Sequence, residues 1–100
     1  NRQLKKEQPF VLGGDAREIY PGQATEETIL VQGIIDVYFE EAGELVVLDY
    51  KTDKVKTARE LQEKYHAQLD YYAQALEQLL GKKVKEKIIY SFTLEKEIQV

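Results

Sequence analysis

The chain has 100 residues, of which 43% are hydrophobic, and its 18 acidic residues outnumber its 14 basic ones to give a formal net charge of −4. This length accommodates one small globular domain. The sequence has no cysteine, which excludes a disulfide framework, a thiolate metal site and an iron–sulfur cluster in this segment. The acidic balance argues against a strong, independent nucleic-acid binder, because such proteins carry a basic surface.

The sequence shows no targeting or membrane signal. Residue 1 is Asn and the chain contains no Met, so we expect either a processed chain or a piece of a longer protein, and we favour the second. No apolar run approaches the roughly 18 residues of a membrane span, and no signal-peptide pattern opens the chain. We therefore expect a cytoplasmic location.

The N-terminal part predicts short elements. Residues 1–8 are polar and basic and indicate a terminal arm or the end of a missing element, and residues 10–12 (Phe-Val-Leu) are a short strand candidate. Residues 13–15 (Gly-Gly-Asp) predict a turn. They do not form a phosphate-binding loop, because no Gly-Lys-Ser/Thr follows and no helix opens there. A strand fragment at residues 19–20 would end in a second turn at residues 21–22 (Pro-Gly).

Two longer strands follow. Residues 28–39 alternate between two faces with a period of two, which predicts a strand. One of its faces comprises Val31, Gly33, Ile35, Val37 and Phe39. Residues 40–43 (Glu-Glu-Ala-Gly) predict a hairpin turn, in which Gly43 takes a positive φ. Residues 45–51 predict a strand that is apolar on both faces in its first half, as a central strand should be.

A long helix comes next. Thr57 and Glu60 fit a capping box, in which a Thr N-cap is followed three residues later by Glu. A helix of roughly six turns would follow and stop at Gly81. Its apolar stripe, with helical spacing, comprises Leu61, Tyr65, Leu69, Tyr72, Ala73, Leu76, Leu79 and Leu80. Residues 87–94 predict a further strand, and residues 97–100 predict another.

This order of elements predicts an α/β fold in a single domain that covers residues 1–100. A hairpin leads into a central strand, and a crossover helix then returns the chain to the sheet. The expected architecture is a mixed β-sheet with helical cover on at least one face.

Three ionisable groups interrupt the apolar strands: Asp36 in the first long strand, and Asp49 and Lys51 in the second. Burying an unpaired charge costs several kcal/mol, so such groups need partners or a metal. Asp49 and Lys51 share a face because side chains alternate. Carboxylates suit Mg²⁺, and the backbone carbonyl of Tyr50 would supply a further ligand. Lys51 would then orient or deprotonate a water that attacks a phosphodiester.

A simpler interpretation fits the same residues. Asp49 and Lys51 could form a buried ion pair, with Asp36 at a strand end. The Asp-x-Lys spacing alone does not separate the two interpretations, but the position of Asp36 one hairpin earlier favours the metal site. On the helix, Gln68 and Tyr72 share one face at i, i+4, where ordinary packing is the alternative to a functional role.

The combination of motifs is more specific than any one of them. Gly33-Ile34-Ile35-Asp36, then Asp49-Tyr50-Lys51-Thr52, then Gln68-x-x-x-Tyr72 resembles the RecB-type nuclease branch of the PD-(D/E)XK superfamily. Within that branch, the chain is similar to the C-terminal nuclease domains of AddA-like subunits, the A subunits of AddAB helicase–nucleases. The similarity covers about residues 8–100.

The resemblance implies a restriction-endonuclease-like mixed sheet flanked by helices, and a Mg²⁺-dependent DNA nuclease of the exonuclease type. It implies that Asp36 and Asp49 bind Mg²⁺, for which Mn²⁺ could substitute, and that both act in catalysis with Lys51. It also implies that Gln68 and Tyr72 shape the site and contact DNA.

The resemblance further implies a larger enzyme that processes double-strand DNA ends, and the single strands produced by unwinding, for recombinational repair. ATP would act only in helicase domains of the same polypeptide, and an AddB-like second subunit would be a partner. The family places a further acid or His on a helix before the first strand, and no such helix precedes residue 10. The alternative function is therefore a catalytically incomplete, nuclease-like domain that acts as a DNA-end or partner-binding scaffold. Thr52 would support the catalytic strand.

Overall fold

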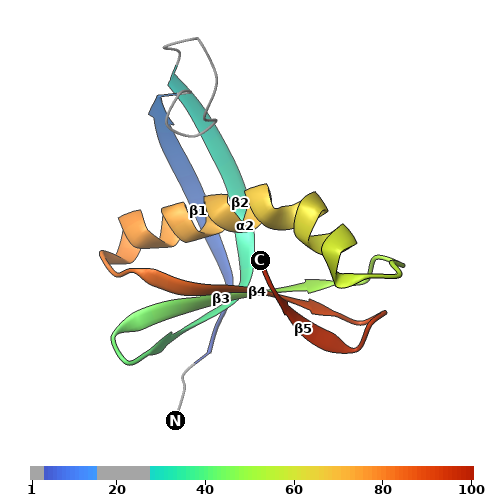
Figure 1. Ribbon diagram of the computed structural model, residues 1–100. Helices are drawn as coiled ribbons and strands as arrows, with labels where there is room; N and C mark the ends of the chain where they lie inside the picture. The colour runs from blue at the N-terminus through green and yellow to red at the C-terminus, as the bar shows by residue number, and fades with distance from the viewer. Residues whose placement is uncertain (1–3, 16–27) are drawn as a thin grey trace.

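A computed structural model describes residues 4–15 and 28–100 of the chain (Figure 1). These residues form strands of one sheet and one long helix. Their bounds, in chain order, are β1 (Lys5–Asp15), β2 (Thr28–Glu41), β3 (Glu44–Lys51), α2 (Ala58–Leu80), β4 (Val84–Ser91) and β5 (Lys96–Gln99).

The strands form one sheet in the order β1-β2-β3-β4-β5. Neighbouring strands are antiparallel except for β3 and β4, which are parallel. Parallel neighbours need a crossover connection, and α2 provides it by crossing one face of the sheet (Figure 1). The predicted α/β fold is confirmed, with its mixed sheet, its central strand and its helical cover on one face.

Strand β1 is longer than the sequence indicates. It begins inside the predicted terminal arm and continues through the predicted turn at residues 13–15, so both predictions are wrong. The reason is that β2 extends equally far and lies opposite; Gly13, for example, pairs with Leu30. This pairing satisfies the backbone hydrogen-bonding groups and outweighs the turn preference of glycine. The predictions for residues 19–22 lie outside the described residues.

A two-residue turn joins β2 to β3. Ala42 and Gly43 both have positive φ, 54° and 80°, as in the tight hairpin turns whose twist matches that of the strands. The predicted positive φ of Gly43 is confirmed, but the turn is shorter than the predicted one. Glu40 and Glu41 belong to β2 and form ion pairs with lysines beyond the end of α2.

The faces of β2 change partway along the strand. Ile35 and Tyr38 both pack in the core under α2 although they are three residues apart, whereas Phe39 packs in a separate, smaller cluster. The prediction that Ile35, Val37 and Phe39 share one face is therefore wrong. The change of faces lies beside an interruption of the regular β1–β2 pairing at Glu7, which has a positive φ of 53°.

Helix α2 begins and ends where the sequence predicts. Thr57 is the N-cap, and its hydroxyl oxygen accepts a hydrogen bond from the backbone N–H of Glu60 at 3.4 Å. Gly81 closes the other end in the left-handed conformation, with φ 67°. The buried face differs from the predicted stripe at its C-terminal end, because Leu79 and Leu80 are exposed. The residues that α2 buries are Leu61, Leu69, Tyr72, Ala75 and Leu76.

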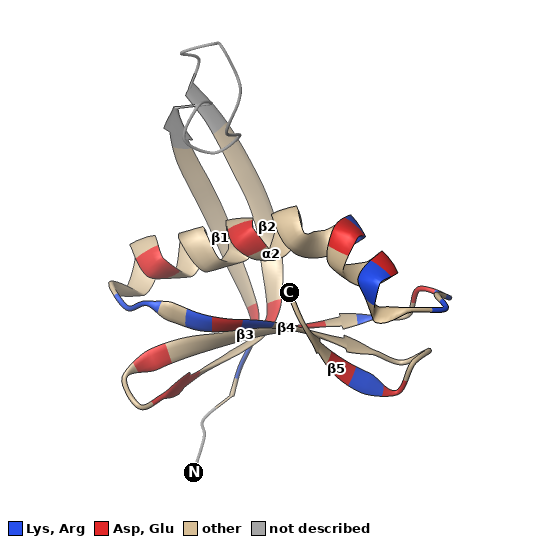
Figure 2. Cartoon of the chain, in the orientation of Figure 1, with Lys and Arg blue, Asp and Glu red and all other residues tan. Residues whose placement is uncertain are grey.

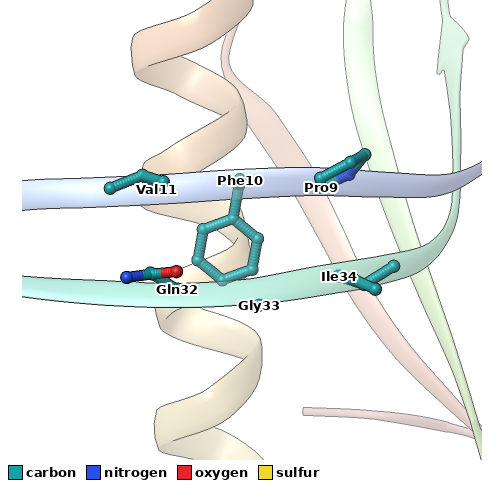
Figure 3. A pocket seen from close by; sticks show the side chains of 6 residues that line it. All are labelled: Pro9, Phe10, Val11, Gln32, Gly33 and Ile34. Atoms are coloured by element: carbon teal, nitrogen blue, oxygen red, sulfur yellow. The ribbon is translucent and has the colours of Figure 1, made fainter.

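A close approach determines how the β1–β2 hairpin meets α2. Phe10 pairs with Gly33 across the hairpin, and its ring lies beside this glycine (Figure 3). The same ring packs edge-on against Tyr72 of α2, with ring centroids 5.3 Å apart and planes at 74°. A Cβ atom on residue 33 would lie 2.8 and 3.0 Å from two ring atoms of Phe10. Glycine at this position therefore leaves room for the ring that joins the hairpin to the helix.

Replacing Gly33 with alanine is expected to destabilise the chain by about 1–3 kcal/mol, because the added methyl group displaces the Phe10 ring from its packed position. Urea-induced unfolding measures the change. Gly13→Ala is the matched control: its Cβ would meet the flexible end of the exposed Leu30 side chain, at 3.0 Å, so we expect a smaller loss. Equal losses in the two variants would contradict the role given to Gly33.

Candidate metal-binding nuclease site

Strands β2 and β3 separate at the end of their ladder. The last residue pair is Val37 with Leu48, and Asp36 lies one residue beyond it. Past this point the backbone N–H of Tyr50 donates its hydrogen bond to a side chain of β2, not to a backbone carbonyl. The acceptor is Oδ2 of Asp36, at 3.1 Å. The structure thus places the Asp36 carboxylate at the split between the two strands.

Asp49 is buried in the central strand, with 2% of its surface exposed. Nζ of Lys51, on the same face of β3, lies 2.8 Å from Oδ2 of Asp49. Among the described residues, however, no donor reaches this oxygen with hydrogen-bond geometry. The ion pair therefore compensates the charge of the carboxylate without completing the hydrogen bonding of its buried oxygen.

The surroundings of Asp49 raise its pKa from 3.8 to about 6. Burial contributes most, because it disfavours the charged carboxylate. A hydrogen bond with the carboxyl group of Asp36 raises the pKa further, while the ammonium group of Lys51 opposes the rise. The carboxyl group of Asp36 is thus a close neighbour that disfavours the charge of Asp49, and a bound cation would relieve this conflict.

Lys51 is held from α2 as well as from its own strand. Its Nζ donates a hydrogen bond to Oε1 of Gln68 at 2.9 Å and lies 4.0 Å from the ring centroid of Tyr65. Both contacts come from one face of the helix, because Tyr65 and Gln68 are three residues apart. The structure therefore brings Lys51 and Gln68 together with Asp49 across the sheet–helix interface.

Tyr72 lies one helical turn after Gln68 and is buried, with 7% of its surface exposed. Its pKa is raised to about 12 by burial and by the negative charges of Asp49 and Asp36. Its hydroxyl therefore stays protonated at neutral pH and remains a hydrogen-bond donor. Gln68 and Tyr72 line a groove between α2 and the β1–β2 hairpin. The burial of Tyr72 favours a supporting role over direct contact with DNA.

The side chains of Tyr50 and Thr52 are exposed. The ring of Tyr50 stacks on that of Phe92, with centroids 5.9 Å apart, so the part of Tyr50 that meets Asp36 is its backbone. The observed contact uses the N–H of Tyr50, and the role of its carbonyl as a metal ligand stays a prediction. The supporting role of Thr52 also stays a prediction.

Sequence reasoning missed two residues of this arrangement, Tyr65 and Asp53. Helical spacing assigns Tyr65 to the core stripe, yet its ring lies over Lys51 and its hydroxyl donates to Oδ2 of Asp53 at 2.8 Å. Asp53 also forms an ion pair with Lys64, at 2.7 Å. Their positions in the sequence could have indicated both residues: Tyr65 precedes Gln68 by three residues and so shares its helix face, and Asp53 follows Lys51 by two residues.

The oxygen atoms at this site fit a small divalent cation. Asp36 and Asp49 present neighbouring carboxyl groups, and one buried oxygen of Asp49 lacks a donor in the described chain. Mg²⁺ binds through one or two carboxylates and keeps several waters. Residues 4–15 and 28–100 contain no group of three His, Cys, Asp or Glu side chains that could hold a metal ion. Two carboxylates would therefore hold the ion together with water and substrate oxygens.

Charge elsewhere on the described chain is mixed. Figure 2 shows basic and acidic segments interspersed along α2 and the strands. Several lysines are paired with acids, such as Lys87 with Asp70 and Lys64 with Asp53. A polyanionic partner would thus meet acids as well as bases on these elements. No helix within the described ranges is long and apolar enough to cross a membrane.

Comparisons of the sequence with a protein-family model and with known proteins both identify nucleases. The PD-(D/E)XK nuclease superfamily matches residues 2–99. The chain is 45% identical over 103 residues to the A subunit of the ATP-dependent helicase/nuclease of Clostridium novyi (strain NT), a match that covers 97% of this chain and 8% of that protein. It is 47% identical over 97 residues to the A subunit from Thermoanaerobacter sp. (strain X514), a match that covers 92% of this chain and 8% of that protein. The chain thus spans less than one tenth of the length of these relatives.

The raised pKa of Asp49 predicts that stability depends on pH when no metal is bound. The folded state binds the Asp49 proton more tightly than the unfolded state, so stability falls as the pH rises from about 4 to about 6 and stays lower above that range. Asp49→Asn removes this contribution. Relative to wild type, the free energy of unfolding of the variant should rise by up to about 3 kcal/mol between pH 4 and pH 7.

Urea-induced unfolding at several pH values in the presence of a chelator measures this difference between Asp49→Asn and wild type. The informative quantity is the change of the difference with pH, because the substitution also leaves Lys51 without its ionic partner at every pH. A difference that stays constant from pH 4 to pH 7 would rule out the raised pKa.

Proposed function

The chain belongs to the PD-(D/E)XK nuclease superfamily, and we propose that it is a Mg²⁺-dependent DNA nuclease domain of the exonuclease type. The observation that carries the proposal is the arrangement around Lys51. Its ammonium group contacts Asp49 on its own strand and Gln68 on α2, beside a buried carboxylate oxygen that lacks a donor in the described chain. A structural ion pair alone would not require the second carboxyl group, that of Asp36, within hydrogen-bond reach.

In this proposal Asp36 and Asp49 hold the metal ion. When bound, Mg²⁺ polarises the scissile phosphate and lowers the pKa of a bound water. A nearby cation also favours the charged form of a carboxyl group, so both acids are ionised in the loaded site. The hydrogen bond from the backbone of Tyr50 orients the Asp36 carboxylate in the protein itself.

Lys51 acts on the attacking water in this proposal. Contacts with Asp49 and Gln68 fix its ammonium nitrogen beside the Asp49 carboxylate, on the face of β3 that α2 covers. From there the ammonium group orients the water or offsets the negative charge that develops on the phosphate, and only the neutral amine form of Lys51 could take a proton from the water. Tyr72 keeps its hydroxyl protonated beside the two acids and supports the site as a neutral donor.

We also propose a larger enzyme around this domain. Its relatives are named as A subunits of ATP-dependent helicase/nucleases, which supports helicase domains in the same polypeptide that use ATP to unwind DNA. An AddB-like second subunit would complete the assembly. The enzyme would process double-strand DNA ends for recombinational repair, and this substrate would place it in the cytoplasm.

One observation favours a second candidate function. The described residues supply two carboxylates and no third ligating side chain at the site, which is a sparse metal shell. A domain that failed to hold its metal would serve as a DNA-end or partner-binding scaffold. The two candidates differ in whether DNA cleavage depends on Lys51 and on a divalent cation.

Lys51→Ala is expected to lower the rate of DNA cleavage by roughly 10²–10⁴-fold, because the variant loses the group that acts on the attacking water. The measurement is nucleotide release from linear duplex and single-stranded DNA by the complete natural protein with Mg²⁺. Lys54→Ala, which removes an exposed lysine three residues away, is the matched control and should keep its activity. Cleavage that survives in Lys51→Ala would refute the assigned chemistry.

Mg²⁺ is expected to raise the melting temperature of the protein, because a ligand that binds only the folded state stabilises it. The apparent affinity should weaken as the pH falls below about 6, since Asp49 must lose its proton to bind the ion. Asp49→Asn should abolish the shift, whereas Glu97→Gln, at an exposed position of β5, should retain it. The absence of a shift in wild type would support the scaffold instead, and a full shift in Asp49→Asn would refute Asp49 as a metal ligand.

A further inference from the structure

Lys51 meets an aromatic ring that the proposed chemistry does not use. Its Nζ lies 4.0 Å from the centroid of the Tyr65 ring, which is within the range of a cation–π contact. We propose that Tyr65 is a positioning residue, whose ring holds the Lys51 ammonium group in the orientation that the nuclease reaction needs. This inference rests on the proposed function, and Tyr65 itself touches neither metal nor substrate in it.

Lys51 meets three partners. Its Nζ forms an ion pair with Oδ2 of Asp49 at 2.8 Å, donates a hydrogen bond to Oε1 of Gln68 at 2.9 Å and lies over the ring of Tyr65. A free lysine has four flexible side-chain bonds and loses rotamer entropy when it is fixed. Two polar contacts leave the group free to swing about the line that joins them. The ring supplies the third point that prevents this motion.

The ring is itself anchored at its far end. The hydroxyl of Tyr65 donates to Oδ2 of Asp53 at 2.8 Å, and Nζ of Lys64 lies 2.7 Å from the same oxygen. Hydrogen bonds from these two groups lower the pKa of Asp53, which stays charged as their acceptor. The backbone carbonyl of Asp53 accepts the hydroxyl of Thr93 at 2.7 Å. The segment after β3 is therefore tied both to α2 and to the residues after β4.

This anchoring has a geometric consequence. Asp53 follows Lys51 by two residues, just after the end of β3, so the segment that carries the lysine also carries the acceptor that orients the ring above it. The hydrogen bond to Asp53 ties the Tyr65 side chain of α2 to this segment. The arrangement keeps the ring of Tyr65 over the ammonium group of Lys51. A positioning role requires this alignment, whereas hydrophobic packing alone does not.

A purely structural role for Tyr65 makes different predictions. Tyr65 also packs at the margin of the main core, so its removal will lower stability whichever role is correct. A structural role depends on the volume of the side chain, whereas the cation–π contact depends on the aromatic face. Tyr65→Phe keeps the face and loses the hydroxyl; Tyr65→Leu keeps an apolar side chain and loses the face. Tyr65→Met provides a second variant without a ring, should the leucine variant fail to fold.

The test measures kcat and KM for linear DNA in the complete natural protein with Mg²⁺. We expect kcat to fall about tenfold in Tyr65→Leu and Tyr65→Met and to stay within about threefold of wild type in Tyr65→Phe, with KM little changed. Leu76→Ala, on the buried face of α2 two helical turns beyond Gln68, is a control for lost stability: it should lower the melting temperature and leave kcat unchanged. Equal losses of kcat in the phenylalanine and leucine variants would overturn the inference.

A double-mutant cycle with Lys51 makes the test specific. In a Lys51→Ala background, Tyr65→Leu should cause no further loss of kcat, because the group that it positions is gone. In the same background, Tyr65→Leu should still lower the melting temperature. The rise in melting temperature that Mg²⁺ causes should be the same in the Tyr65→Leu variant as in wild type. Additive losses of kcat would refute the positioning role. A wild-type protein that does not cleave DNA would instead refute the proposed function, so the two failures are distinguishable.

Discussion

The arrangement of the site depends on one unfavourable burial, that of the Asp49 carboxylate in the central strand of the sheet. Taking a carboxylate out of water costs several kcal/mol unless opposite charge and hydrogen bonds compensate. Lys51 provides the charge from two residues away on the same face, whereas the neighbouring Asp36 carboxyl group raises the pKa of Asp49. One oxygen of Asp49 still lacks a donor in the described chain, which leaves a binding capacity that a cation would satisfy.

The sheet has to open for a second carboxylate to reach Asp49. The last residue pair between β2 and β3 is Val37 with Leu48, and next to this end of the ladder lies a groove lined partly by Glu7, Asp36 and Tyr50. The same stretch holds the positive φ of Glu7 and the change of faces in β2. The strand irregularity and the position of Asp36 therefore belong to one feature, since regular alternation would not leave this side chain at the split.

The sequence predicted the features that follow local rules. The helix cap at Thr57 and the shared face of Asp49 and Lys51 follow from residues a few positions apart, so pattern and spacing were enough. Residues 13–15 join a strand only because β2 lies opposite them, and tertiary pairing of this kind leaves no local signal. Helical spacing placed Tyr65 on the buried side of α2 but could not show that its ring faces Lys51, because spacing reports a direction and not a partner.

Metal binding of the kind proposed here would reverse the charge of the site. At neutral pH the carboxylates of Asp36 and Asp49 and the ammonium of Lys51 sum to about −1, which repels a phosphodiester, and a divalent cation changes this sum to about +1. The chain as a whole is acidic, with a net charge of −4, and its described elements mix both signs. The loaded site would thus be a main local attraction for a DNA backbone, and productive DNA binding to this domain would follow metal binding.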